Sequence, residues 1–217
     1  MTLTRRGVLR AASLLSGATA AAACTPGTPA PAISPSANAV TMNSPNLLIA
    51  YFSRPGENYW NGGRRTLTIG NTEALAGMLA DRLRCTVYRI EASDPYPASY
   101  DDTVARNVRE QDTNARPAIA RPLPNLAAYD VVLLGSPIWN LRPPMIMNTF
   151  LDRVDLRGKT ILPFVTYAVS GLGSTTDLYR AAAPGATVGD GLAVRGEQVT
   201  DAAQQITRWL TTTGLHS

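Results

Sequence analysis

The residues of this 217-residue chain that could do chemistry gather in three short stretches. The first begins at Ser53-Arg54 and closes at Gly70-Asn71-Thr72, so it offers two hydroxyls, an amide and a glycine that lets the backbone approach closely. A helix beginning here would add free N–H groups and its positive dipole end, which together bind a phosphate without any lysine. The alternative is a simple asparagine cap on that helix. Arg54 either touches the phosphate or lies in solvent.

The second and third stretches could hold a flat ring. The second comprises Pro137, Ile138, Trp139 and Asn140. The indole of Trp139 either stacks on a planar ligand or packs against its own fold. The third stretch is rich in small residues, as expected where backbone approaches a heterocycle, and comprises Thr166, Tyr167, Ala168, Ser170, Gly171 and Gly173.

Several common chemistries lack their residues. The only histidine is His216, the penultimate residue of the sequence, which argues against a Ser-His-Asp triad and a histidine-based metal site. Gly158-Lys159-Thr160 imitates a phosphate-binding P-loop, but Arg153 stands where the first glycine should be. We therefore expect no catalytic side chain and no metal ligand, and we favour a cofactor that carries its own chemistry.

The three stretches can meet only if predicted strands bring them to the same place in the fold. Residues 46–52, 130–135 and 160–166 are continuous apolar runs, which favour strands buried on both faces of a parallel sheet. Pro163 weakens the third run because proline removes a ladder donor. Residues 85–90 predict a peripheral strand, and residues 192–194 are a weaker fifth candidate.

Helical patterns alternate with these runs. They cover residues 71–83, 101–111, 143–154 and 200–210, and Ser174 with Asp177 resembles a capping box that opens another helix. Strand–helix alternation predicts a three-layer α/β fold, in which the three stretches all follow the carboxyl ends of strands.

The charge and the first 45 residues point away from nucleic acid and toward export. The net charge is +4, but Arg5, Arg6 and Arg10 are the only charged residues before Asn46, so the remainder carries about +1. Residues 1–23 resemble an export signal, either of the twin-arginine type or an ordinary secretory one. Residues 24–45 are rich in Pro, Ala, Ser and Thr and are predicted to be a linker, in which Cys24 is a candidate lipid anchor to the membrane. Residues 46–217 are predicted to form the domain. We expect an extracytoplasmic protein.

The chain from about residue 47 to residue 210 resembles the flavodoxin-like family of FMN-binding proteins, and within it a bacterial subgroup with a long first loop. The resemblance rests on Ala50-Tyr51-Phe52-Ser53-Arg54, Gly56-Glu57-Asn58-Tyr59, Gly70-Asn71-Thr72-Glu73, Gly135-Ser136-Pro137-Ile138-Trp139, Asn148-Thr149-Phe150-Leu151 and Ser170-Gly171-Leu172-Gly173. It implies a five-stranded parallel sheet in the order 2-1-3-4-5. It also implies FMN with its phosphate at Ser53, Arg54, Asn71 and Thr72 and its ring between the second and third stretches.

Three departures from the family are visible. Residues 55–69 are an insert between the first serine and the helix-opening glycine, and they form either a lid or a surface excursion. Asn140 stands where the subgroup often has a second aromatic residue, and Tyr167-Ala168 also differ, which bears on ring stacking more than on phosphate binding.

The resemblance implies an FMN-binding redox protein that transfers electrons or reduces a small, quinone-like acceptor. Its partner would be a redox protein or that small molecule, and not a nucleic acid. The competing hypothesis is an exported flavodoxin-like module without flavin that binds a ligand or a partner.

Overall fold

Three apolar runs form the centre of a parallel sheet in the computed structural model, which describes residues 45–215. They are β1 (Leu47–Phe52), β5 (Val131–Pro137) and β6 (Thr160–Tyr167), and β4 (Thr86–Ile90) flanks β1 on the other side. The order is β4-β1-β5-β6, followed on the far side of β6 by β7 (Thr187–Val188) and β8 (Leu192–Arg195). The predicted order 2-1-3-4-5 is confirmed, and β7 is an additional short strand.

Pro163 fits into β6 because of how the two short strands share its outer side. β7 pairs with Thr160 and Ile161, while β8 pairs with residues from Phe164 to Tyr167. Pro163 falls in the gap between them and faces Leu134 only on the β5 side. A proline is tolerated where the ladder has no partner on one side.

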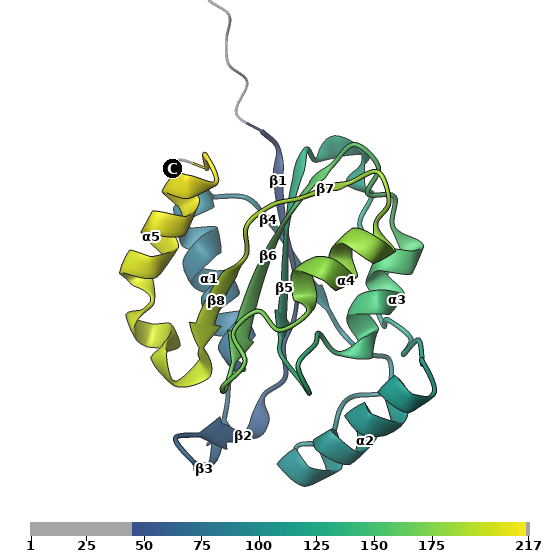
Figure 1. Cartoon of the computed structure of the whole chain (residues 1–217), viewed down its shortest axis with the longest axis vertical. Helices are drawn as coiled ribbons and strands as arrows, with labels where there is room; N and C mark the ends of the chain where they lie inside the picture. The colour runs from purple at the N-terminus through teal and green to yellow at the C-terminus, as the bar shows by residue number, and fades with distance from the viewer. Residues whose placement is uncertain (1–44, 216–217) are drawn as a thin grey trace, which may run out of the picture. The chain divides into compact units, whose positions relative to one another are not determined.

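Helices cover both faces of the sheet (Figure 1), with α1 (Asn71–Leu83) and α5 (Ala203–Thr212) on one face and α3 (Met145–Arg153) and α4 (Thr175–Ala182) on the other. One core cluster joins the sheet to α3 and α4 through residues such as Phe150 and Tyr179, and the second joins it to α1 and α5 through residues such as Leu75 and Ile206. The predicted three-layer α/β architecture is confirmed. Within residues 45–215, no helix is both long and apolar enough to cross a membrane.

Two elements lie apart from these layers, at the carboxyl edge of the sheet (Figure 1). One is α2 (Tyr100–Asp112), which covers neither face of the sheet. The other is a hairpin of β2 (Gly56–Trp60) and β3 (Gly63–Leu67), formed by the insert 55–69. Its two-residue turn is Asn61-Gly62, and both residues have positive φ, of 47° and 87°, as a type I′ hairpin turn requires.

The helix starts differ from the prediction at two places. Ser174 precedes α4, but its side chain makes no cap, because its Oγ donates to the carbonyl of Leu141 at 3.2 Å. The last helix begins at Ala203 because residues Gly196–Asp201 form a 3-10 helix, η2. A second short 3-10 helix, η1, spans Leu126–Ala128 before β5. The predicted export signal, nearly all of the linker, Cys24 and His216 lie outside the described residues.

Candidate functional site

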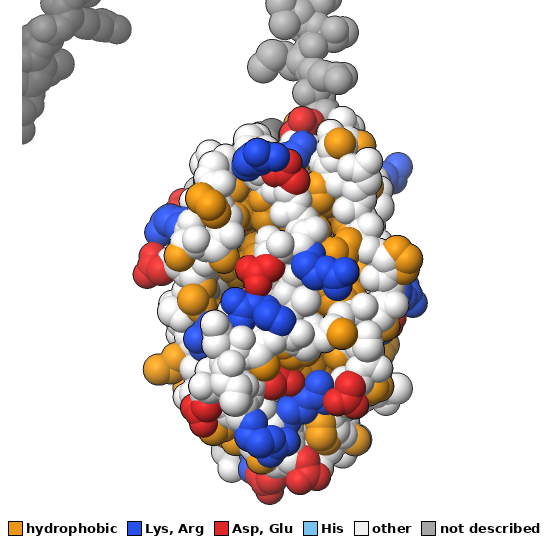
Figure 2. Space-filling model, turned by 90° about the vertical axis from the view of Figure 1, so that its right-hand side faces the viewer, with side chains coloured by type: hydrophobic (Ala, Val, Ile, Leu, Met, Phe, Trp, Pro, Cys, Tyr) orange, Lys and Arg blue, Asp and Glu red, His pale blue; other side chains and the backbone are white. Residues whose placement is uncertain are grey.

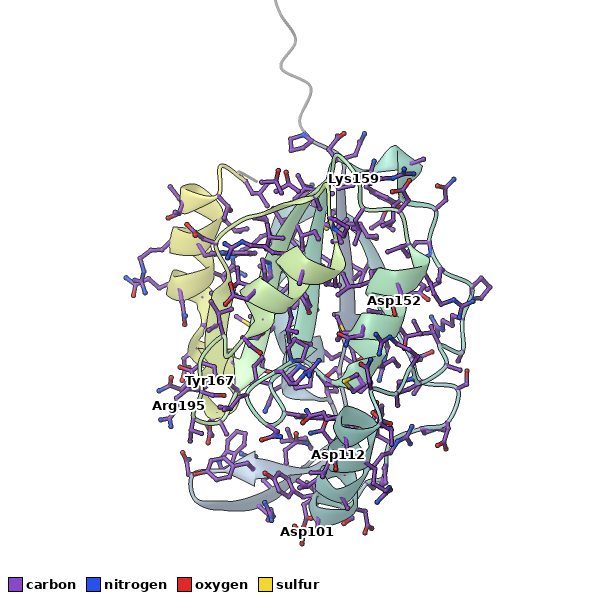
Figure 3. The ribbon with its side chains drawn as sticks, turned by 45° about the vertical axis from the view of Figure 1, so that its right-hand side comes forward. Asp101, Asp112, Asp152, Lys159, Tyr167 and Arg195 are labelled. Atoms are coloured by element: carbon purple, nitrogen blue, oxygen red, sulfur yellow. The ribbon has the colours of Figure 1, made fainter. Side chains whose placement is uncertain are left out.

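A cleft lies at the carboxyl ends of β1, β5 and β6, where the three stretches meet. Most of the predicted residues line it, namely Ser53, Arg54, Asn71, Thr72, Pro137, Ile138, Trp139, Thr166, Tyr167 and Ala168. Figure 3 shows Tyr167 of β6 and Arg195 of β8 toward this end of the molecule and Lys159 at the opposite end. In open α/β sheets, ligands bind at this edge, where the strand order reverses.

Hydrogen bonds through Thr166 tie the three stretches together. Its hydroxyl lies 2.7 Å from the hydroxyl of Thr72, and its carbonyl accepts the N–H of Ile138 at 2.8 Å. Thr72 and Thr166 are both buried. The floor of the cleft is therefore a fixed, uncharged surface and does not depend on mobile side chains.

The amino end of α1 opens into this floor. Gly70 is the residue before the helix and makes no side-chain cap, so the asparagine-cap alternative is wrong. The Oγ of Ser53 accepts the N–H of Glu73 at 3.0 Å. The N–H groups of Asn71 and Thr72 have no partner within the helix, as in any first turn, and with the dipole they favour an anion.

Gly70 is required by a close approach of two backbone segments. A Cβ at this position would lie 2.3 Å from the Oγ of Ser53 and 2.5 Å from the carbonyl oxygen of Arg54. Such distances are shorter than any real Cβ contact, so only glycine lets residues 53 and 54 close against the helix start. Gly70 shapes the site but does not line the cleft.

Arg54 is neither in solvent nor free. Its side chain is buried, with 8% exposed, and its guanidinium donates to the carbonyls of Pro97, Ala98 and Glu57. Burial lowers the pKa of this guanidinium, opposed by the charge of Glu57. Arg54 therefore joins the hairpin to the loop before α2, and it borders the cleft from that position.

Trp139 lines the cleft, but its indole is packed. The ring meets Phe52 at 5.7 Å and Tyr96 at 5.2 Å between centroids, both in edge arrangements. Burial and a hydrogen bond from its hydroxyl to the Glu110 carboxylate raise the pKa of Tyr96, so this phenol stays protonated. The indole therefore packs against its own fold and also forms a wall of the cleft, and its stacking on a planar ligand stays a prediction.

The turn after Trp139 joins the second stretch to the third. Asn140 and Leu141 have positive φ, of 49° and 65°, and Trp139 and Arg142 exchange backbone hydrogen bonds across them. Gly173, with φ +53°, packs so closely here that a Cβ would lie 2.2 Å from the Leu141 carbonyl oxygen. Asn140, Ser170, Gly171 and Gly173 therefore do not line the cleft. Of the third stretch, only residues 166–168 line the cleft.

Sequence reasoning missed five residues that line the cleft. They are Asn58, Tyr59, Tyr100, Gly196 and Glu197. The first two come from the hairpin, which the Asn61-Gly62 dipeptide could have signalled. The others come from α2 and η2, whose positions depend on tertiary contacts and carry no local signal.

Glu197 links the hairpin tip to η2. Its Oε1 accepts the N–H of Asn61 at 3.0 Å, and its Oε2 is buried without a partner among the described residues. A buried acceptor without a donor costs about 1–3 kcal/mol. Glu197 lines the cleft, and this unpartnered oxygen is buried within it.

The arrangement can bind an anion through uncharged donors and hold a flat group against backbone. In residues 45–215, no cluster of three or more His, Cys, Asp or Glu side chains is placed to hold a metal ion. The enclosed part of the cleft measures about 90 Å³. That is below the ~300 Å³ of pockets that enclose a whole drug-sized ligand, so a larger ligand would extend through the open mouth.

Comparisons with known proteins agree with this geometry. Residues 66–213 match the family model described as Flavodoxin. A search of curated proteins finds no significant match.

Solved structures share the fold. A protein assigned as a flavoprotein from Bacteroides uniformis is 28% identical, with a TM-score of 0.62, covering 77% of this chain and 99% of that one. A similar protein from Bacteroides eggerthii is 27% identical, with a TM-score of 0.62, covering 78% of this chain and 98% of that one. A flavoprotein from Lactobacillus acidophilus, solved in complex with FMN, is 21% identical, with a TM-score of 0.53, covering 74% of this chain and 99% of that one. The last likeness establishes the fold alone.

Proposed function

The chain belongs to the flavodoxin family, and from that premise we propose that its cleft binds FMN and that the protein is a flavin-dependent redox protein. The observation that carries the proposal is the amino end of α1, where Gly70 lets Ser53 and Arg54 close against the helix and the N–H groups of Asn71 and Thr72 have no partner within it. A related fold from Lactobacillus acidophilus was solved with FMN. The FMN phosphate is the anion that such a site of neutral donors fits.

The orphaned oxygen of Glu197 supports FMN over a simple phosphate. A carboxylate repels a phosphate, but its unpartnered Oε2 would accept a hydrogen bond from a hydroxyl of the ribityl chain. Glu197 would then orient the cofactor, with its phosphate at the start of α1 and its ribityl chain at η2. Asn71 lies between them, because its side-chain amide packs against Gly196.

FMN would supply one- and two-electron chemistry through its ring. The chain would hold the ring between residues 137–139 and residues 166–168, with the backbone of both segments fixed through Thr166. We propose that the acceptor is a small, quinone-like molecule or a redox protein. The face drawn in Figure 2 favours the small molecule, because acidic and basic side chains are interspersed there and do not form a steering patch of one sign.

A titration with FMN and with riboflavin tests the proposal. Wild-type protein should quench FMN fluorescence at a single site and bind riboflavin, which lacks the phosphate, more weakly. In Asn71→Asp the new charge should weaken FMN binding about thirtyfold, since repulsion in a partly desolvated site amounts to a few kcal/mol. Riboflavin binding should change less than threefold.

Asn114→Asp is the matched control, because Asn114 is exposed, does not line the cleft and already accepts a hydrogen bond from Arg116. It should leave both affinities unchanged. Wild-type protein that binds no flavin would refute the proposal and leave a flavodoxin-like binding module. Equal losses for FMN and riboflavin in Asn71→Asp would place the phosphate elsewhere.

A further inference from the structure

A second cavity of about 320 Å³ lies beside the cleft, between α2 and the second stretch. Five residues line both this cavity and the cleft, so a ligand in it would be next to a ligand in the cleft: Arg54, Asn58, Tyr100, Ile138 and Trp139. Its volume falls at the lower end of the ~300–1,000 Å³ range of small-molecule sites. It is large enough for a compound of one or two rings.

The orientation of α2 supplies the apolar wall of this cavity. The helix buries polar side chains, those of Thr103, Asn107 and Glu110. Its two valines, Val104 and Val108, lie one turn apart and are 43% and 42% exposed, and both line the cavity. A helix ordinarily turns its apolar residues to the core. In α2 the two valines instead give the cavity an apolar wall.

The cavity offers no free charge to a ligand. Among the described residues that line the cavity, Arg54 alone is charged at neutral pH, and its guanidinium already donates to three backbone carbonyls. The other polar groups are amides and hydroxyls, including those of Asn58, Asn107 and Asn140. An uncharged ligand fits these walls better than an anion or a cation.

Asn107 provides a donor at the back of the cavity. Its side-chain oxygen accepts from Gln111 at 3.3 Å, which fixes the amide with its Nδ2 turned the other way. Gln111 also donates to the Trp139 carbonyl and accepts from Asn140, so the amides form one network. In the described part of the chain, the Nδ2 of Asn107 donates to no protein group, and a ligand carbonyl could accept from it.

We propose that this cavity binds the small-molecule acceptor, an uncharged aromatic carbonyl compound of one or two rings such as a naphthoquinone. Its ring lies against Val104 and Val108, and one carbonyl oxygen accepts from the Nδ2 of Asn107. The proposal rests on the proposed function for the role of this ligand as the acceptor, but binding in the cavity can be measured without FMN.

Isothermal titration of the whole chain with 1,4-naphthoquinone, with and without saturating FMN, tests the proposal. The wild-type protein should bind the quinone at one site, and Val104→Asp should weaken binding at least tenfold because it places a charge against the ring. Asn107→Ala should weaken it about fivefold. A sulfonated naphthoquinone, which is anionic, should bind more weakly than the neutral compound.

Val87→Asp is the matched control, because Val87 is 45% exposed, on the edge strand β4 and outside the cavity. It should bind the quinone as the wild type does. If Val87→Asp lost as much quinone affinity as Val104→Asp, the proposal would be overturned. It would also be overturned if the wild-type protein bound no quinone. A change of oligomeric state in Val104→Asp with unchanged quinone affinity would also overturn it, since the valines would then face a second copy.

The same variants separate this proposal from the proposed function. FMN affinity should be unchanged in Val104→Asp, because Val104 does not line the cleft. A wild-type protein that binds no FMN but binds naphthoquinone in a Val104-dependent manner would refute the FMN proposal while the cavity assignment stands.

Discussion

The floor and the rim of the cleft are built in different ways. The floor consists of Ser53, Asn71, Thr72 and Thr166, which are uncharged and line the cleft where central strands meet the start of α1. Thr72 and Thr166 are joined by their hydroxyls, Ser53 accepts the N–H of Glu73, and Gly70 lets the first loop close against the helix. The rim consists of the β2–β3 hairpin and α2, which are joined by side chains, among them an ion pair of Arg64 with Asp101 at 2.8 Å. We infer that the floor determines whether an anion binds, whereas the rim determines how long it stays and what lies beside it.

The largest effect should follow from adding one methyl group at Gly70, where the first loop closes against α1. Gly70→Ala would place its Cβ against the Arg54 carbonyl and Ser53 Oγ, so the first loop must move away from α1. We expect FMN affinity to fall about a hundredfold, or ~2.7 kcal/mol, in a fluorescence-quenching titration.

Gly77→Ala serves as the control in the same helix. A Cβ at Gly77 meets nothing within 4 Å, so this variant should bind FMN normally. Its free energy of unfolding should also be higher than that of the wild type by up to ~1 kcal/mol, because alanine is the better helix former. Equal FMN affinities for the two variants would show that the close approach at Gly70 does not form the site.

A smaller effect is expected where the floor meets the rim. Arg54→Met keeps much of the side-chain length but leaves three carbonyls without the donor that now reaches them. We expect the free energy of unfolding to fall by about 2 kcal/mol, since a hydrogen bond to a charged group contributes ~1.5–3 kcal/mol. Urea denaturation followed by circular dichroism measures it.

Arg195→Met is the comparison, because Arg195 is exposed and donates to one carbonyl, that of Ala168. It should cost less than about 1 kcal/mol. If the two variants were equally stable, Arg54 would not be the brace between the loop and the hairpin.

The same contrast explains what the sequence could predict. The floor follows from local rules: continuous apolar runs give buried parallel strands, and polar residues directly after them meet at one edge. The five strands, the positions of the helices and the meeting of Thr72 with Thr166 were therefore accessible from the pattern.

The rim was not accessible, since its geometry depends on distant contacts. Residues 101–111 have a helical pattern, but nothing in them shows that Asn107 is buried while Val104 is exposed. The packing of Trp139 depends on contacts with Phe52 and Tyr96, which belong to distant parts of the sequence. The sequence around Pro163 does not show that two short strands share one side of β6, which is why a proline is tolerated there.

The smallest effect should come from the rim alone. Arg64 bonds to Asp101, and its guanidinium also lies 3.4 Å from the centre of the Tyr100 ring, so it fastens the hairpin to α2. Exposed ion pairs contribute only about 0–1 kcal/mol, and Arg64→Ala should leave the free energy of unfolding nearly unchanged. It should nevertheless let the hairpin open more often, and stopped-flow measurement should show FMN leaving about threefold faster. Arg157→Ala, which removes an exposed pair with Asp155 far from the cleft, should not change that rate. An FMN dissociation rate that Arg64→Ala leaves unchanged would mean that the hairpin borders the cleft without closing it, and the floor alone would then account for binding.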